Sequence, residues 1–266
     1  MGTIITLTTD FGLEDAFVGM MKGVILGINP GVTIVDLCHL IPPQDIAGAA
    51  FLIHTSHRYF PPGTIHVVIV DPGVGSQRRS VALQTPLAAF VAPDNGLLSY
   101  VVREMIQRQV PYSLVHLDRP SYWLPHVSAT FHSRDIFAPV AAYLSTGVPL
   151  SEMGEPIQEL VMLPHSGPLR QGEAWLGRVT HVDYFGNLIT DFAPEEIQEL
   201  RPETSLQLSI GSQVIQGLKR TYSEGRPGCP MALIGSLGYL EIAIPNGNAA
   251  QSLGAGVGTP VRLEFR

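Results

Sequence analysis

Residues 66–79 read HVVIVDPGVGSQRR, and this short stretch contains both a buried strand and a cluster of polar side chains. The run Val67–Val70 has four branched apolar residues, too few for a helix and typical of a strand buried on both faces of a parallel sheet. Asp71 ends the run, and two nearby glycines permit a sharp turn before the basic pair Arg78 and Arg79. The pattern predicts a carboxylate and a guanidinium at the C-terminal edge of a central strand, where open α/β sheets bind ligands. A structural ion pair that closes the loop explains the same residues equally well.

Strands and helices alternate along the first half of the chain. Residues 3–9 form a second β-rich run that also ends on a carboxylate, Asp10. The expected elements are strands at 3–9, 33–37, 67–70, 80–83 and 88–92 and helices at 15–26, 45–57, 97–107 and 136–144. Short strands that alternate with helices predict an α/β fold with a central, mainly parallel sheet and right-handed crossovers.

The pattern of expected secondary structure changes in the second half of the chain. Residues 149–172 lose their periodicity and fill with Pro, Gly and polar residues, as at a domain junction. From residue 173 onward, short β runs are separated by turns, and no long helical pattern follows residue 200. We therefore expect an N-terminal α/β domain over 1–165 and a smaller C-terminal β-barrel domain over 172–266.

Composition argues against several classes of protein. The 266 residues are 45% hydrophobic and 15% charged, which is typical of a globular chain. The net charge of -7, with scattered Lys and Arg, argues against nucleic acid as a partner, and no apolar run suggests a membrane span or a secretory signal. Two distant cysteines, Cys38 and Cys229, indicate neither a disulfide framework nor a thiolate metal site. We expect a cytoplasmic protein with neither nucleic acid nor membrane as a partner.

Candidate functional side chains recur where strands end and helices begin. Asp10 and Asp71 end strands, Arg78 follows the second of them, and His132 precedes an apolar helix. A single His in such a position is more often structural than catalytic. The signatures of zinc proteases, phosphate-binding loops and serine hydrolases do not occur in the sequence. The residues alone predict a small-molecule site without identifying its ligand.

Six longer motifs identify a family. They are TTDFG (8–12), VDPGVGSQRR (70–79), APDNGLL (92–98), TFHSRDIFAPVAA (130–142), VDYFGNLIT (182–190) and GSLGYLEIAIPNGNAA (235–250). In kind and order, these motifs resemble those of the S-adenosyl-L-methionine (SAM) hydroxide adenosyltransferases, which are SAM hydrolases related to the fluorinase and chlorinase enzymes. Because the motifs span nearly the whole chain, the resemblance is highly specific.

The resemblance implies an activity. Members of this family cleave SAM with water to adenosine and methionine, with inversion expected at the ribose 5′ carbon. Asp71, Arg78 and His132 match the residues that position the attacking water, so these three are the expected catalytic residues. Because a neutral thioether leaves readily, the enzyme chiefly holds a water in line and takes its proton. We expect SAM as the substrate, no cofactor and no metal, and the identity of the proton acceptor stays open.

The resemblance also implies substrate contacts and an assembly. Asp10 is expected to bind the ribose hydroxyls, Asp183 the methionine ammonium and Asn187 the adenine edge. The other expected substrate-binding residues are Tyr222, which would stack on the base, Thr130, Ser133, Ser236, Glu241 and, through nearby backbone, Ile244. In related enzymes the nucleoside lies between the N-terminal domain of one subunit and the C-terminal domain of a neighbour in a trimer. The resemblance therefore implies a homotrimer with sites at its subunit interfaces.

Two other functions stay open. Ser133 stands where hydrolases commonly carry Gly and where the fluorinase has a Ser that helps hold its halide, which suggests a halide-using SAM-dependent 5′-halogenase. Asp71 and Val74 argue against it, because the fluorinase carries Tyr and Thr at those positions. A carboxylate beside the nucleophile would also repel a halide by about 1 kcal/mol at roughly 4 Å even in water. A non-catalytic adenosine- or SAM-binding protein is the other alternative, although a receptor has no need of three water-positioning side chains.

Overall fold

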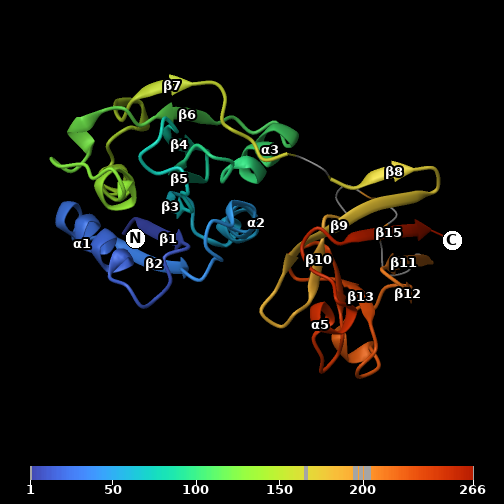
Figure 1. The fold of residues 1–266 in the computed structure, drawn as a ribbon. Helices are drawn as coiled ribbons and strands as arrows, with labels where there is room; N and C mark the ends of the chain where they lie inside the picture. Colours follow the sequence, from blue (N-terminus) through green and yellow to red (C-terminus); the bar gives the residue numbers. More distant parts are fainter. Residues whose placement is uncertain (1, 165–166, 194–196, 198–199, 201–204, 266) are drawn as a thin grey trace. The chain divides into compact units, whose positions relative to one another are not determined.

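The fold is taken from a computed structural model that describes residues 2–164, 167–193, 197, 200 and 205–265 (Figure 1). The chain divides into two compact units, Met1–Leu163 and Pro164–Arg266. Within the described ranges, every helix is too short or too polar to cross a lipid bilayer.

The first unit is built on a seven-stranded sheet with the strand order β2-β1-β3-β5-β4-β6-β7. The strands are β1 (Ile4–Thr9), β2 (Thr33–Cys38), β3 (Thr64–Ile69), β4 (Ser80–Gln84), β5 (Ala88–Pro93), β6 (Ser113–His116) and β7 (Glu155–Ile157). The first four strands in that order pair in parallel, which confirms the predicted α/β class with central parallel strands. The other three strands extend the sheet with antiparallel pairs. The direction changes because β4 and β5 are joined by a short turn rather than by a crossover helix.

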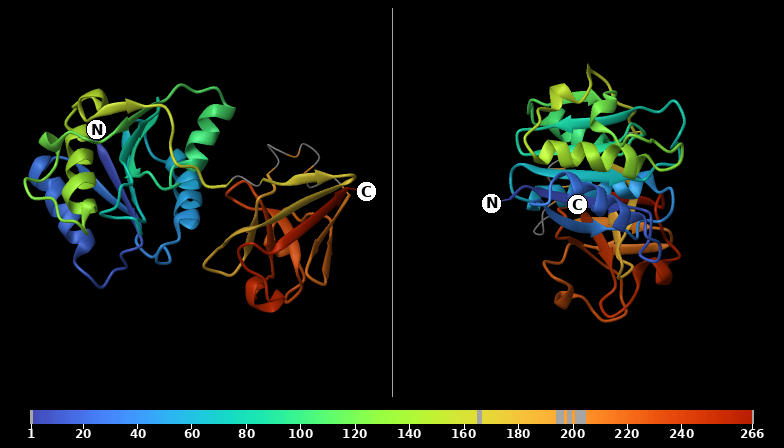
Figure 2. Two further views of the ribbon diagram at one scale, coloured as in Figure 1. Left: turned by 45° about the horizontal axis from the view of Figure 1, so that its top comes forward. Right: turned by 90° about the vertical axis from the view of Figure 1, so that its left-hand side faces the viewer.

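Helices cover both faces of this sheet. Figure 2 shows α1 (Phe17–Ile28) and α4 (Ala138–Ser145) on one face and α2 (Ile46–Ser56) and α3 (Ser99–Gln107) on the other. Side chains alternate along β3, so Val67 and Ile69 pack in the core beneath α1 and α4, whereas Val68 packs in the core beneath α2 and α3. The expected burial of this strand on both faces is confirmed.

Several shorter helices complete the first unit. The 3₁₀ turns are η1 (His57–Tyr59), η2 (Pro120–Tyr122) and η4 (Leu150–Glu152). The helix expected at 136–144 is preceded by a π-helical turn, η3 (Ser133–Phe137), in which the N–H of Ala138 donates to the carbonyl of Ser133. Such i→i+5 turns occur often at functional sites, and this one follows His132 directly.

The described part of the second unit contains an eight-stranded sheet with the order β12-β11-β15-β9-β10-β14-β13 and with β8 paired to β9. The pairings along this order are antiparallel, and β12 contacts β13, so the sheet closes nearly into a barrel and confirms the predicted β-barrel. The elements are β8 (Leu169–Gln171), β9 (Ala174–Val182), β10 (Leu188–Thr190), β11 (Leu206–Ile210), β12 (Gln213–Gln216), η5 (Tyr222–Glu224), β13 (Met231–Ile234), β14 (Leu240–Ala243), α5 (Ala249–Leu253) and β15 (Pro260–Phe265). Alternate side chains of these strands, such as Leu208 and Leu263, fill the barrel core.

Candidate functional site

The structure brings Asp71, Arg78 and His132 together just beyond the C-terminal end of β3. Nε and Nη2 of Arg78 donate to the two carboxylate oxygens of Asp71 over 3.0 and 2.6 Å. The same Nη2 lies 2.8 Å from Nδ1 of His132, a residue 54 positions further along the chain. One guanidinium thus joins the strand-end carboxylate to the start of the π turn.

Gly75 allows these two segments to meet. Its φ of +77° lies in the left-handed region that favours glycine. A Cβ at this position would also collide with the carbonyl oxygen of Ala129, in the loop that leads to His132. Only glycine therefore lets the turn after Asp71 pack against that loop.

The ion pair is buried and well satisfied. The side chains of Asp71 and Arg78 are only 7% and 9% exposed, and Nη1 of Arg78 donates to Oγ of Ser80 over 2.9 Å. The guanidinium also lies 5.3 Å from the ring centre of Phe137. A buried ion pair is costly unless its hydrogen-bonding groups are satisfied, and the two-pronged pairing satisfies this one and fixes its orientation.

The contact with Arg78 determines the protonation state of His132. A guanidinium can only donate hydrogen bonds, so Nδ1 of His132 must accept, and the proton of the neutral ring lies on Nε2. Burial, followed by the nearby charge of Arg78, lowers the pKa of His132 from its ordinary value of 6.5, although Asp71 and Asp135 oppose the shift. The ring is therefore neutral at neutral pH.

The adjacent Arg79 has a different role. Its Nε and Nη2 donate to Oδ2 of Asp94 over 2.8 and 2.5 Å, and Oδ1 of Asp94 accepts from the backbone of Val161 at 2.7 Å. Arg78 thus contacts Asp71 and His132, whereas Arg79 forms an ion pair with Asp94.

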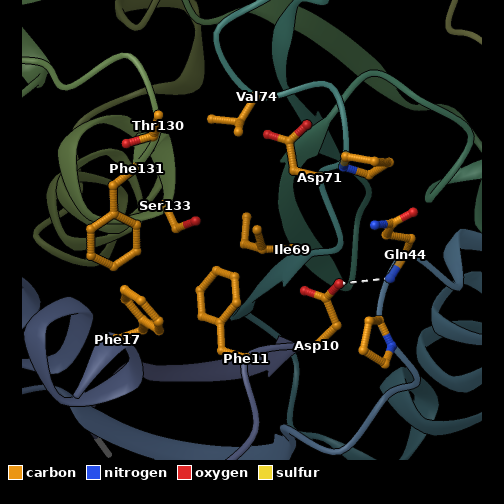
Figure 3. A pocket seen from close by; sticks show the side chains of 12 residues that line it. Asp10, Phe11, Phe17, Gln44, Ile69, Asp71, Val74, Thr130, Phe131 and Ser133 are labelled. Atoms are coloured by element: carbon orange, nitrogen blue, oxygen red, sulfur yellow. Dashed lines mark hydrogen bonds between the residues drawn. The ribbon is translucent and has the colours of Figure 1, made fainter. Parts of the chain in front are cut away.

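A cavity of about 310 Å³ opens beside the Asp71 carboxylate (Figure 3). Its lining combines two carboxylates with mostly apolar side chains: Asp10, Phe11, Phe17, Pro43, Gln44, Ile69, Asp71, Pro72, Val74, Thr130, Phe131 and Ser133. The volume is near the lower end of the range for small-molecule sites, and a mostly apolar wall with a few polar groups is typical of them.

Three of the expected substrate-binding residues line this cavity. Asp10 follows β1, and its Oδ2 accepts from the backbone N–H of Gln44 over 2.9 Å, as the dashed line in Figure 3 shows. Thr130 precedes His132 in the chain, and Ser133, which is 5% exposed, begins the π turn. Arg78 and His132 are not among the lining residues, although Asp71, which Arg78 contacts, and Ser133, which follows His132, both line the cavity.

Four further expected residues gather within the second unit. Oδ1 of Asp183 accepts from the backbone N–H of Asn187 at 2.8 Å, and Oδ2 accepts from the Asn187 side chain at 2.9 Å. The hydroxyl of Tyr222 donates to Glu241 over 2.6 Å. Burial raises the pKa of both Tyr222 and Glu241, and the charge of Asp183 raises each further. The neighbouring carboxylates make this cluster a favourable place for a cationic group.

The last two expected residues lie on either side of β14. Ser236 is exposed in the turn between β13 and β14. Ile244 follows β14, its side chain is buried in the barrel core, and its carbonyl accepts from the N–H of Gly247 over 2.9 Å. A ligand contact through the backbone near Ile244 is compatible with this burial, whereas a side-chain contact is not.

The aromatic wall of the cavity is the part of the site that sequence reasoning missed. Phe11, Phe17 and Phe131 have ring centres 5.3 to 6.1 Å apart. The positions of Phe11 and Phe131, each next to a motif residue, were a usable signal. The sequence around Phe17 gave no such signal, because the helical spacing of Phe17 is that of an ordinary core residue.

Comparison with known proteins places this geometry in a family. The family model described as the SAM hydroxide adenosyltransferase N-terminal domain matches residues 5–154, and the corresponding C-terminal domain matches residues 177–262. A solved structure, titled as an uncharacterized conserved protein from Thermotoga maritima, superposes with a TM-score of 0.90 at 31% identity, covering 97% of this chain and 99% of that one.

Curated relatives agree with the family match. A Thermus thermophilus protein named (R)-S-adenosyl-L-methionine hydrolase is 38% identical, covering 96% of this chain and 97% of the relative. A Methanocaldococcus jannaschii protein of the same name is 33% identical, covering 94% and 91%. A protein from Nocardia brasiliensis named fluorinase is 29% identical, covering 98% and 97%. The resemblance found in the six motifs is confirmed, and the chain belongs to the SAM hydroxide adenosyltransferase family.

Proposed function

We propose that the protein is a SAM hydrolase, which uses water to cleave SAM into adenosine and L-methionine. The observation that carries this proposal is the Asp71–Arg78–His132 arrangement beside a cavity suited to a small molecule. The names of the curated relatives support the same substrate and reaction.

The chemistry places modest demands on the protein. The water oxygen forms a bond to the ribose 5′ carbon while the carbon–sulfur bond breaks and its electron pair returns to sulfur, and one proton of the water is released. Because the leaving group is a neutral thioether, the reaction as proposed needs no cofactor, and positioning of the water supplies much of the rate enhancement.

Each member of the triad has a distinct role in this proposal. Arg78 fixes the plane of the Asp71 carboxylate by two hydrogen bonds. His132 has Nδ1 occupied by Arg78 and carries its proton on Nε2, so in this form it donates to the water rather than accepting from it. We therefore propose the Asp71 carboxylate, which lines the cavity, as the proton acceptor.

The cavity suits a sulfonium substrate. Its two carboxylates, Asp10 and Asp71, favour a cation, and we propose that Asp10 accepts hydrogen bonds from the ribose hydroxyls. The apolar wall keeps the reacting centre poor in water, which favours the transition state because the sulfonium loses its charge as the bond breaks. We assign Thr130 and Ser133 to the same substrate-binding wall.

We further propose that the residues of the second unit complete the site of a neighbouring subunit in a homotrimer. Asp183 would bind the methionine ammonium, Asn187 the adenine edge and Tyr222 the base, with Glu241, Ser236 and the backbone near Ile244 beside them. The cluster of carboxylates around Asp183 supports a contact with an ammonium group. Two free cysteines suit a reducing compartment, so we propose that the trimer acts in the cytoplasm.

A halide-using halogenase is the second candidate. The buried Ser133 hydroxyl in the cavity wall is the observation that favours it. The Asp71 carboxylate in the same wall opposes an anionic nucleophile, so we rank water first.

Incubation of the purified protein with SAM in halide-free oxygen-18 water tests the reaction. We expect many turnovers, with the label in the 5′ hydroxyl of adenosine and none in methionine, as read by mass spectrometry. Parallel reactions with saturating chloride or fluoride are the control and should yield no 5′-halo-adenosine. A halogenated product would support the second candidate, and a single turnover or none would indicate a binding protein.

Substitution within the triad tests its roles. We expect Asp71→Asn and Arg78→Lys each to lower kcat by about 100-fold or more, since the first removes the proton acceptor and the second removes the two-pronged contact. Arg79→Lys is the matched control, because Arg79 pairs with Asp94 and should leave kcat within about threefold of wild type. Thermal melts establish that each variant is folded, and folded triad variants with wild-type turnover would contradict the assignment.

The pH dependence of kcat/KM tests the state of His132. Protonation of the ring at low pH would place two cations against each other and break the contact with Arg78, so the rate should fall as the solution is acidified. Because the pKa of His132 is lowered, the midpoint should lie below 6.5. His132→Asn retains an acceptor near Nδ1 but does not titrate, so it should lose this acid limb and stay more active than His132→Ala. An unchanged acid limb in His132→Asn would exclude the ring as its source.

Mixed assemblies test the shared site. Light scattering should give a mass of three chains, and Asp71→Asn and Asp183→Ala should each be inactive when expressed alone. Random mixed trimers of the two should recover about one quarter of the wild-type sites, because an intact first unit then meets an intact second unit of its neighbour. A monomeric mass with full activity, or trimers that regain nothing on mixing, would contradict a site shared between subunits.

A further inference from the structure

Another cluster of polar side chains lies in the first unit, away from the cavity. It comprises His54 in the last turn of α2, His57 at the start of η1 and Glu104 in α3. The two histidines are three residues apart in sequence, and Figure 1 shows α2 and α3 on the same side of the sheet. None of the three was singled out by the sequence analysis.

The facing atoms of this cluster are buried and lack hydrogen bonds. The side chains of His54, His57 and Glu104 are 12%, 10% and 12% exposed. Oε2 of Glu104 lies 3.4 Å from Nδ1 of His54 and 3.6 Å from Nε2 of His57, and all three atoms lie within 4.8 Å of one another. Among the described residues, none supplies a hydrogen-bond partner to any of these three atoms. Buried polar atoms without partners are rare and costly, so such a group calls for an explanation.

The contacts within the cluster are longer than ordinary hydrogen bonds. Nδ1 of His54 and Nε2 of His57 lie 3.4 and 3.6 Å from Oε2 of Glu104, whereas protein N–H···O hydrogen bonds span about 2.7–3.2 Å. At these separations the three groups gain little from one another, and an ion held between them would supply the missing partner.

The spacing of the three atoms is that of a metal site. Zinc binds imidazole nitrogen and carboxylate oxygen at about 2.0–2.2 Å in a tetrahedron, so neighbouring donor atoms lie roughly 3.3–3.6 Å apart. The two separations from Oε2 of Glu104, 3.4 and 3.6 Å, agree with this value, and the two histidine nitrogens lie within 4.8 Å of each other. We propose that His54, His57 and Glu104 bind one zinc ion, with water as the fourth ligand, and that the ion ties α2 to α3.

The charged groups around the cluster are compatible with this site. Nε of Arg108 lies 3.3 Å from Oε1 of Glu104, which leaves Oε2 for the metal and orients the carboxylate. Arg58 is the other nearby cation, since its charge contributes to the lowered pKa of His54. His66 lies behind His57, with ring centres 6.2 Å apart, and its own Nε2 is buried without a hydrogen bond within the described structure. The immediate surroundings thus hold two cations and one additional imidazole.

The proposed ion is structural rather than catalytic. The cavity lies where β3 ends and where α2 begins, next to Gln44, whereas His54 lies on the order of 12 Å further along α2. The ion would clamp two helices that cover one face of the sheet. It should therefore raise thermal stability and leave the hydrolysis of SAM unchanged, so this inference stands apart from the proposed function.

Metal titration of the wild-type chain tests the proposal directly. After treatment with a chelator, the protein should bind one equivalent of Zn²⁺, measured by calorimetry and by elemental analysis after dialysis, and its Tm should rise with Zn²⁺ concentration. Co²⁺ in place of Zn²⁺ should give the intense visible absorption bands of a tetrahedral site. Because these readouts use the unaltered chain, they do not depend on whether any variant folds.

Variants locate the site. Glu104→Gln and the double variant H54Q/H57Q should weaken Zn²⁺ binding by about 100-fold or more and abolish the cobalt bands, since loss of even an outer-shell partner costs about 10- to 100-fold. His126→Gln, which removes an exposed histidine elsewhere, is the matched control and should bind as wild type does. No saturable binding by the wild type, or equal binding by the variants, would overturn the proposal and leave a water molecule as the occupant of the cluster.

Discussion

The two-pronged hydrogen bond between Asp71 and Arg78 is the interaction on which the arrangement of the first unit's site depends. Because both prongs are satisfied, the guanidinium cannot rotate, and its remaining donors are aimed at His132 and Ser80. The guanidinium lies over the ring of Phe137, which belongs to the π turn that His132 precedes. Two segments that are far apart in sequence, 71–80 and 132–137, are therefore joined at one guanidinium, and Gly75 supplies the close approach that permits it.

The pleat of the sheet explains why two adjacent arginines serve different purposes. Arg78 and Arg79 immediately precede β4, and successive side chains of an extended chain point to opposite sides. Arg79 is held beside the end of β5, because the backbone of Asp94 donates to its carbonyl over 2.9 Å. Its side chain then reaches the Asp94 carboxylate, while that of Arg78 turns to Asp71. The sequence alone could not separate the two residues, since the strand that imposes the alternation had to be located first.

Other parts of the fold could be predicted for a simple physical reason. Strands such as β3 and helices such as α1 are long and apolar enough to show a period in the sequence, and their expected positions agree with the structure to within a few residues. Strands β6, β7, β8 and β10 have only three or four residues each, too few to show a period, and the sequence did not predict them. The π turn was also hidden, because a single additional residue per turn does not disturb the apolar pattern of 136–144. The contact between Arg78 and His132 depends on that turn. The sequence pattern could therefore suggest each of the two residues as a candidate, but it could not predict that they meet.

The charge balance of the cavity bears on which nucleophile it can hold. Arg78 is the cation of the triad, and both oxygens of the Asp71 carboxylate pair with it. The wall also contains the Asp10 carboxylate, which accepts a hydrogen bond from the backbone N–H of Gln44, together with aromatic rings and aliphatic side chains. An anion entering this space would meet a net negative wall and would lose its hydration as well, whereas a neutral water would lose far less. A cationic sulfonium gains from the same wall, so the cavity that attracts the proposed substrate also disfavours a halide as its partner in the reaction.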